Sequence, residues 1–229
     1  MAHPYVLHYA PDNASLPVRL VLEELGVAYR TRLVDRASEA QRKPEYLAVN
    51  PTGLIPALET PYGVVSETAA ILLWLADRHG ALFPATADPA RGERLRWLFF
   101  ASNTLHAELR RLFYARLYVG GDEDDQSLLR RYSCAAISGH LQLLDTAMPD
   151  GHDPDILDWY LAAMLRWCAL YPQDFDHSWF DLQQYPALQS MALRIEARDS
   201  THAAQTAEGL GPTPFTAPRA PEPPEGSAL

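Results

Sequence analysis

The hydrophobic and polar positions of the first 83 residues follow two different periods. Four short and mostly apolar runs have the length and alternation of strands, and they cover residues 5–9, 28–34, 55–59 and 63–65. Apolar residues at helical spacing predict helices, or a turn in the shortest case, over residues 16–25, 44–47 and 67–77. The resulting order, βαβ(α)ββα, predicts a small mixed sheet with helices on its faces.

After residue 84 only the helical period continues. Asp88 at the N-cap position and Pro89 at the first helical position predict the start of a long helix. Further helices are predicted over residues 126–148, after a cap at Asp155, and from about residue 185 to 198. No strand pattern follows residue 88, so this half of the chain is predicted to be entirely helical.

The chain is therefore predicted to have an α/β domain (residues 1–83), an all-α domain (residues 88–208) and a tail (residues 209–229). The tail contains six prolines and three glycines, which exclude a helix or a central strand. Disorder is the usual outcome for such a composition. However, Phe215 and Leu229 offer apolar contacts, and prolines reduce the entropy lost on ordering. We predict that the tail packs on the protein body through Phe215.

Charge and cysteine content narrow the function classes. The net charge of −10 disfavours nucleic acid and anionic membranes as partners. The strongly apolar run at residues 71–76 is far shorter than the roughly 20 residues that span a bilayer, and the N-terminus does not resemble a secretory signal. Cys134 and Cys168 form no CxxC pair and are expected to be core thiols, and no histidine lies at metal-ligand spacing from them. These features predict a cytoplasmic protein without a metal.

Several motifs resemble those of the cytosolic glutathione transferases. Residues 48–58, AVNPTGLIPAL, resemble the family's NPxGxxPxL run, and residues 65–75, VSETAAILLWL, resemble its ES-x-AI-x-x-YL run. Residues 9–16, YAPDNASL, resemble the opening of bacterial beta-type members, and residues 155–158 resemble the capping box of the core helix. The chain is identified as a member of this family.

The resemblance implies a thioredoxin-like N-terminal domain, an all-α C-terminal domain and a homodimer. It implies that glutathione is a co-substrate whose thiolate attacks a small hydrophobic electrophile. Two alternatives stay open because many functions share one fold. One is a glutathione-binding or interaction module with little transferase activity. The other is a glutathione-dependent isomerase, lyase or reductase.

The resemblance also implies how glutathione binds. Family members hold the bond before the proline equivalent to Pro56 in the cis form, which exposes the main chain of Ile55 to a peptide ligand. Ser66, Glu67 and Thr68 begin a helix, whose free N–H groups suit a carboxylate. Thr68 could hold the γ-glutamyl carboxylate, and Glu67 the ammonium. Without the motif, Ser66 is an N-cap and Glu67 a first-turn residue.

The group that activates the thiol is less defined. Beta-type enzymes have a cysteine at the position of Ala14, so mixed-disulfide chemistry from this position is excluded. Ser15 is the nearest hydroxyl, which could donate to the thiolate or cap the first helix. Asn13 and the tyrosines at positions 5 and 9 are alternatives. His106 matches a histidine of the beta-type active site, with an ordinary structural role as the alternative.

Cationic side chains complete the predicted site. The family often supplies a lysine or arginine after the second strand for the glycyl carboxylate, and the candidates are Arg36, Arg42 and Lys43. Arg110 and Arg111 could bind an anionic group or form a salt-bridged face. Trp167 matches a family tryptophan and could line the cleft or the core.

Overall fold

The computed structural model describes residues 5–149 and 151–228. Within these residues the sheet has four strands, in the order β2-β1-β3-β4: β1 (Tyr5–Tyr9), β2 (Tyr29–Leu33), β3 (Ala57–Thr60) and β4 (Gly63–Ser66). β1 runs parallel to β2 and antiparallel to β3, and β3 and β4 form a hairpin. All four predicted strands are confirmed. β3 begins at Ala57 rather than Ile55, because Pro56 has no N–H to donate to a neighbouring strand.

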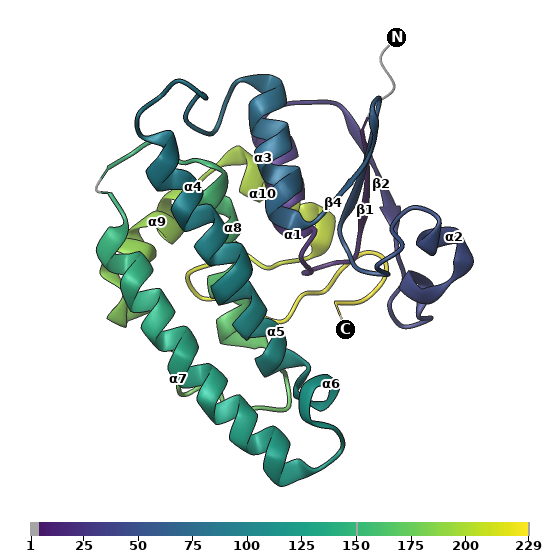
Figure 1. Ribbon diagram of the computed structural model, residues 1–229, viewed down its shortest axis with the longest axis vertical. Coiled ribbons are helices and arrows are strands. Elements are labelled where there is room, and N and C mark those ends of the chain that lie inside the picture. Colours follow the sequence, from purple (N-terminus) through teal and green to yellow (C-terminus); the bar gives the residue numbers. More distant parts are fainter. Residues whose placement is uncertain (1–4, 150, 229) are drawn as a thin grey trace.

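Four helical segments accompany the sheet: α1 (Leu16–Glu24), η1 (Ala40–Arg42), α2 (Pro44–Leu47) and α3 (Thr68–His79). α1 and α3 lie on the side of the sheet that faces the rest of the protein, and α2 lies on the other side (Figure 1). α1 is buried along residues 16–22, since it packs between the sheet and the second half of the chain. This is the predicted thioredoxin-like arrangement.

The beginning of α3 differs from the prediction at Ser66. Ser66 is the last residue of β4 and pairs with Ala57, so it is not the N-cap. Glu67 occupies the N-cap position with φ 70° and ψ 117°. The hairpin extends one residue further than the apolar pattern indicates, so the chain must reverse at Glu67. A non-glycine residue with positive φ costs about 1–3 kcal/mol, and such residues concentrate at functional sites.

From residue 91 to 208 the described chain forms only helices and loops: α4 (Arg91–Phe100), the π-helical η2 (Ala101–His106), α5 (Ala107–Phe113), α6 (Ala115–Val119), α7 (Glu123–Ala147), α8 (Ile156–Leu170), η3 (Leu182–Gln184), α9 (Pro186–Glu196) and α10 (Asp199–Glu208). The first helix begins later than predicted. Asp88 accepts a hydrogen bond from the N–H of Ala90 (2.8 Å), as a cap does, but residues 89 and 90 form a turn and α4 begins at Arg91. α10 was not predicted separately.

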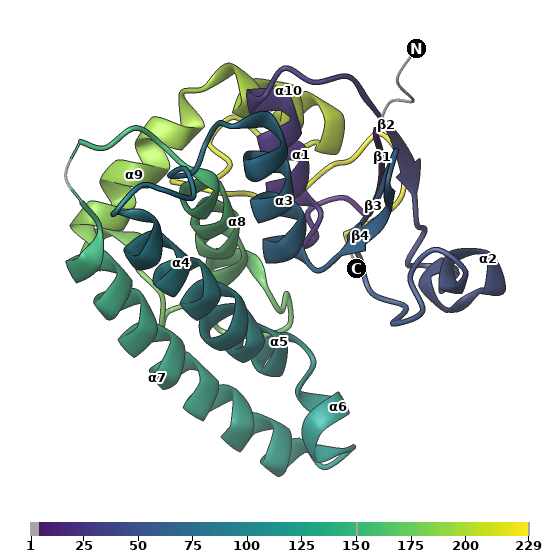
Figure 2. The same ribbon diagram turned by 45° about the horizontal axis from the view of Figure 1, so that its top comes forward.

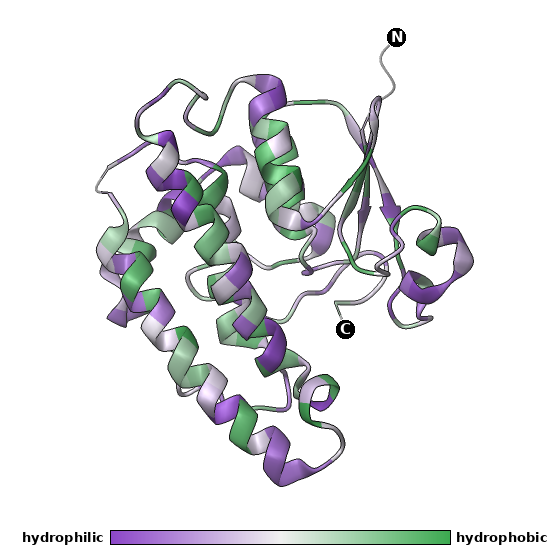
Figure 3. Ribbon diagram, in the orientation of Figure 1, coloured by the Kyte–Doolittle hydropathy of each residue, from purple (hydrophilic) through white to green (hydrophobic). Residues whose placement is uncertain are grey.

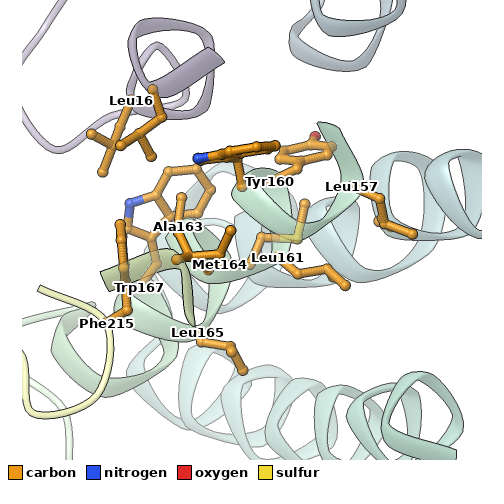
Figure 4. Packing of buried hydrophobic residues seen from close by; sticks show 14 of the residues in the cluster. Leu16, Leu157, Tyr160, Leu161, Ala163, Met164, Leu165, Trp167 and Phe215 are labelled. Atoms are coloured by element: carbon orange, nitrogen blue, oxygen red, sulfur yellow. The ribbon is translucent and has the colours of Figure 1, made fainter. Parts of the chain in front are cut away.

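α8 is the centre of the core. Every residue from Ile156 to Cys168 is buried, and the predicted capping box between Asp155 and Asp158 is present. Figure 4 shows how side chains of α8 pack against Leu16 of α1 and against Phe215. Hydrophobic residues are concentrated on α3 and α8, whereas the outer helices carry more polar residues (Figure 3). Cys134 and Cys168 are free and buried, as predicted.

The tail has no helix or strand in its described part, yet it is packed. Phe215 is 1% exposed and belongs to the core, which confirms the predicted contact. The carboxylate of Glu196 accepts hydrogen bonds from the N–H groups of Phe215 (2.9 Å) and Thr216 (3.0 Å). The chain then crosses to the sheet, where Glu225 bonds to the hydroxyl of Tyr9 (Figure 2). Leu229, the other predicted contact, lies outside the described residues.

Candidate active site

A cavity of about 640 Å³ lies between the sheet and the helical half. It is lined by the turn after β1, the loop before β3, the start of α3, and residues of η2, α5, α6, α7 and α8. The structure brings six of the predicted site residues together on its wall: Asn13, Ile55, Pro56, Glu67, Thr68 and His106. Ser15, Ser66 and Lys43 are not among the described residues that line it.

The loop before β3 presents an open main chain to this cavity. The Ile55–Pro56 bond is cis, as expected from the family resemblance. The hydroxyl of Tyr46 and the side-chain amide of Asn50 both donate to the carbonyl of Leu54, at 2.6 and 2.7 Å, and fix the loop. Neither the N–H nor the C=O of Ile55 takes part in a backbone hydrogen bond with a described residue. An extended peptide can therefore pair with Ile55 as an added strand.

The start of α3 offers a second set of groups. The hydroxyl of Thr68 donates to the carbonyl of Ala14 (3.0 Å), so that hydroxyl proton is not available to a ligand. The first N–H groups of α3 have no partner inside the helix and carry partial positive charge. Glu67 lines the cavity and has no ion pair with a described residue. A ligand that carries a carboxylate and an ammonium on the same carbon atom could bind here. The N–H groups of α3 would bind the carboxylate, and Glu67 would bind the ammonium.

Ser15 is in the wrong place for the predicted role at the thiol. Its side chain is fully buried, and its hydroxyl donates to the carbonyl of Ala10 (3.0 Å) and accepts from the N–H of Ala10 (3.3 Å). It also makes no side-chain cap to α1. Its hydroxyl instead closes the turn after β1, which the sequence pattern around residues 11–15 does not distinguish from a cap.

The two tyrosine alternatives are also engaged elsewhere. The hydroxyl of Tyr5 is hydrogen-bonded to His79 (3.1 Å), and that of Tyr9 donates to Glu225. Burial raises the pKa of Tyr9 further above its ordinary value. Neither residue is among those that line the cavity.

Asn13 does face the cavity. Its Oδ1 accepts a hydrogen bond from the N–H of Ala14 (2.9 Å), which fixes the orientation of the amide. No described residue accepts a hydrogen bond from its Nδ2. Asn13 therefore presents a neutral donor to the cavity at the start of α1.

His106 faces the same cavity from η2. Its Nδ1 lies 2.7 Å from the hydroxyl of Tyr160. The centroid of its ring lies 5.3 Å from that of Trp167, with an angle of 38° between the ring planes. Burial and the charge of Arg110 lower the pKa of His106 to about 4, so the imidazole is neutral at pH 7. Burial raises the pKa of Tyr160, which keeps its phenol protonated.

The direction of the hydrogen bond between His106 and Tyr160 sets the tautomer of the imidazole. When the phenol donates to Nδ1 of His106, the imidazole proton resides on Nε2. Nε2 has no hydrogen-bond partner among the described residues, so with this tautomer it is a second neutral donor. Ser102 and Tyr160 were missed by the sequence analysis, because nothing local distinguishes them from other helical residues.

Of the three cationic candidates after β2, Arg36 and Arg42 line the cavity and Lys43 does not. Lys43 is exposed, and its ammonium lies 3.4 Å from the hydroxyl of Ser38, away from the cavity. Lys43 precedes Pro44 and has an extended backbone, whereas the short turn of η1 directs Arg42 to the cavity. Arg36 also lines it, and its guanidinium donates to the hydroxyl of Tyr114 (3.1 Å).

Asp12 is a buried residue of the site that the sequence analysis did not predict. Its backbone has φ 47°, and its carboxylate accepts hydrogen bonds from Arg166 (2.9 Å), Trp167 (3.2 Å) and Tyr171 (2.6 Å). These partners follow Asp12 by more than 150 positions, so no local pattern indicates them. They hold the turn that carries Asn13. Trp167 thus both lines the cavity and belongs to the core.

No group of three or more histidine, cysteine, aspartate or glutamate side chains among the described residues could hold a metal ion. None of the helices in the described chain has the length and apolar character required to cross a membrane.

A thioredoxin-like sheet followed by a helical bundle, with a site for an extended peptide between them, defines the glutathione transferase fold. A sequence profile of the "Glutathione S-transferase, N-terminal domain" matches residues 14–78. Glutathione S-transferase GST-4.5 of Xanthomonas campestris is 30% identical over 214 residues, which cover 89% of this chain and 98% of that protein.

Solved structures agree with this relationship. The beta class glutathione S-transferase of Sphingomonas chungbukensis has a TM-score of 0.71 and 31% identity, over 89% of this chain and 98% of that chain. A sphingomonad glutathione S-transferase complexed with glutathione has a TM-score of 0.72 and 30% identity, over 90% of this chain and 100% of that chain. The chain belongs to the glutathione S-transferase family.

Proposed function

We propose that the protein binds glutathione in the cavity between its two halves and transfers the thiolate to a small electrophile. One observation carries this proposal. A single cavity contains the open main chain of Ile55, the carboxylate of Glu67 at the start of α3, and the neutral donors Asn13 and His106. In this arrangement the cysteinyl main chain of glutathione pairs with Ile55, and the γ-glutamyl end lies at α3.

Thiol activation follows from the two donors. A free cysteine thiol has a pKa near 8.5, and the thiolate is the attacking form. The amide of Asn13 and the Nε2–H of His106 stabilise the thiolate as hydrogen-bond donors, which lowers the pKa of the bound thiol. A charged imidazole is not needed, since the pKa of His106 is about 4.

The residues that line the cavity favour conjugation by glutathione over a reduction that uses a cysteine of the protein. Cys134 and Cys168 are both buried, and neither lines the cavity. Burial also raises the pKa of each thiol, to about 11 for Cys134 and higher for Cys168, so neither is a thiolate at neutral pH. The glutathione thiol is then the nucleophile.

The test is the substitution Glu67→Gln, which removes the partner of the glutathione ammonium and preserves the size of the side chain. Hydrogen bonds to charged groups contribute about 1.5–3 kcal/mol, so we expect a roughly 10- to 100-fold weaker Kd for glutathione by titration calorimetry. Glu45→Gln is the matched control, because Glu45 is exposed in α2 and does not line the cavity.

An unchanged Kd for the Glu67→Gln protein would exclude this binding mode. Conjugation is measured separately with 1-chloro-2,4-dinitrobenzene. Glutathione binding by the natural chain without turnover of this or other electrophiles would indicate a binding module rather than a transferase.

We further propose that the enzyme is a cytoplasmic homodimer. Tyr62 and Val64, on the edge hairpin, are 70% and 47% exposed, and a second copy could cover them. The free state of both cysteines is consistent with a reducing compartment. A solution mass of one chain, 25.6 kDa, by light scattering would contradict the dimer.

A further inference from the structure

The charge of the cavity is opposite to that of the protein. The chain has a net charge of −10. Among the described residues, five arginines line the cavity, at positions 36, 42, 110, 116 and 130. The two carboxylates on the wall are Asp12 and Glu67, and Asp12 is already paired with Arg166 at 2.9 Å. A cleft lined by one sign of charge concentrates ligands of the opposite sign.

The arginines come from two sides. Arg36 and Arg42 belong to the sheet half, beside the proposed path of glutathione, and one of them can serve its glycyl carboxylate. Arg110, Arg116 and Arg130 belong to α5, α6 and α7, on the side of the second substrate. Glutathione bound along Ile55 does not account for this second group.

Arg110 is the most informative of the second group. It is partly buried on the cavity wall and makes no hydrogen bond or ion pair with a described residue. The next residue, Arg111, is exposed and paired with Glu108 at 2.6 Å. Arg111 therefore has an anionic partner within the chain, whereas Arg110, which faces the cavity, has none among the described residues.

The hydrogen-bond donors of Arg130 are also only partly paired. Its side chain is 19% exposed, and its Nε is buried without a hydrogen-bond partner. Its ion-pair partner is Asp174, which is 74% exposed and 3.6 Å away. Buried donors without partners are rare in proteins and destabilising, so a group that binds there would be favoured.

We propose that the second substrate carries a carboxylate, which Arg110 binds with support from Arg116 and Arg130. This inference rests on the proposed transferase function and specifies its substrate class. The guanidinium fork suits a carboxylate in geometry and charge. Phe113 and Leu117 line the same side and contact the apolar body of the substrate. The small hydrophobic electrophile that the resemblance implies is thus specified as one that carries a negative charge.

The reaction balances without a further reagent. With an aryl chloride, the thiolate forms a carbon–sulfur bond, the carbon–chlorine bond breaks, and chloride leaves with its electron pair. The thiol proton goes to solvent.

The experiment compares 4-chloro-3,5-dinitrobenzoate with its methyl ester. Each kcat/KM is divided by the uncatalysed rate with glutathione, which removes the intrinsic difference in reactivity. We expect the natural chain to prefer the acid. We expect Arg110→Gln to lower this preference about 10- to 100-fold. Arg110→Lys, which keeps the charge without the fork, should recover part of it. The matched control Arg111→Gln should retain the preference of the natural chain.

Three outcomes would overturn the inference. The first is conjugation of the ester with no preference for the acid, which leaves the proposed function intact. The second is an equal preference in the natural chain and Arg110→Gln. The third is a second glutathione per chain in titration calorimetry that Arg110→Gln abolishes, because the arginines would then hold glutathione. Turnover of neither substrate by the natural chain, with or without glutathione binding, would contradict the transferase function itself.

Discussion

The substitution Phe215→Ala tests whether the proline-rich tail is part of the folded core. Phe215 is 1% exposed, in a segment that has no helix or strand to hold it. Its ring lies near Trp167 and Leu165 of α8, which are themselves buried (Figure 4). Removing the ring leaves a cavity beside α8 and also weakens the attachment of the chain around it.

The magnitude follows from this burial. Replacing a fully buried phenylalanine by alanine costs about 3–5 kcal/mol in a well-packed core. For a chain of this size, 1 kcal/mol corresponds to roughly 2–4 °C in Tm, so we expect Tm to fall by about 6–20 °C. The two hydrogen bonds from the N–H groups of Phe215 and Thr216 to Glu196 remain possible in the variant. The fall therefore reports side-chain packing.

The assay is thermal unfolding followed by circular dichroism. Phe99→Ala is the matched control, because Phe99 lies on α4 and is 50% exposed. We expect that control to change Tm by no more than about 1–2 °C, since surface substitutions stay near ±0.5 kcal/mol. A Phe215→Ala protein that melts with the natural chain would refute the reasoning. Deletion of residues 212–229 without a change in Tm would do the same.

Two further predictions concern the buried polar groups around the site. Asp12→Asn removes the countercharge of the fully buried Arg166, and we expect a loss of about 3–5 kcal/mol in urea unfolding, whereas a loss below about 1 kcal/mol would contradict it. His106 has a folded pKa of about 4, below its ordinary 6.5, so the unfolded chain binds the proton first. Its contribution to stability is full above pH 6.5 and is lost as the pH falls towards 4. His106→Gln should therefore lose less stability between pH 7 and pH 4.5 than the natural chain, and equal losses would refute this.

The fold could be predicted from the sequence where the signal is local. Strand and helix periods depend on neighbours within a few residues, and the capping box at Asp155 is contained in four residues. Predicted boundaries failed where a polar residue had two possible roles. Ser66 resembles a helix cap, yet its pairing with Ala57 in the sheet determines its conformation. Asp88 does make the hydrogen bond of a cap, but the two residues after it form a turn, so α4 begins only at Arg91.

The site was predictable only in part, for a related reason. Glu67 and Ile55 belong to contiguous motifs, and they do line the cavity. Lys43 and Arg42 are adjacent, so only the direction of the backbone decides which one reaches it. Ser15 has the right residue type at the right position, but the main chain of Ala10 uses its hydroxyl.

The turn that carries Asn13 depends on contacts between residues that are far apart in the sequence. Asp12, beside Asn13, accepts a hydrogen bond from Arg166 at 2.9 Å. The same guanidinium donates to three carbonyls of the tail, those of Leu210 (3.2 Å), Pro214 (3.1 Å) and Arg219 (2.9 Å). One buried arginine thus joins the turn of the active site to the tail. Because the tail supplies partners that Arg166 would otherwise lack, its packing stabilises the turn that carries Asn13, the proposed donor to the thiol.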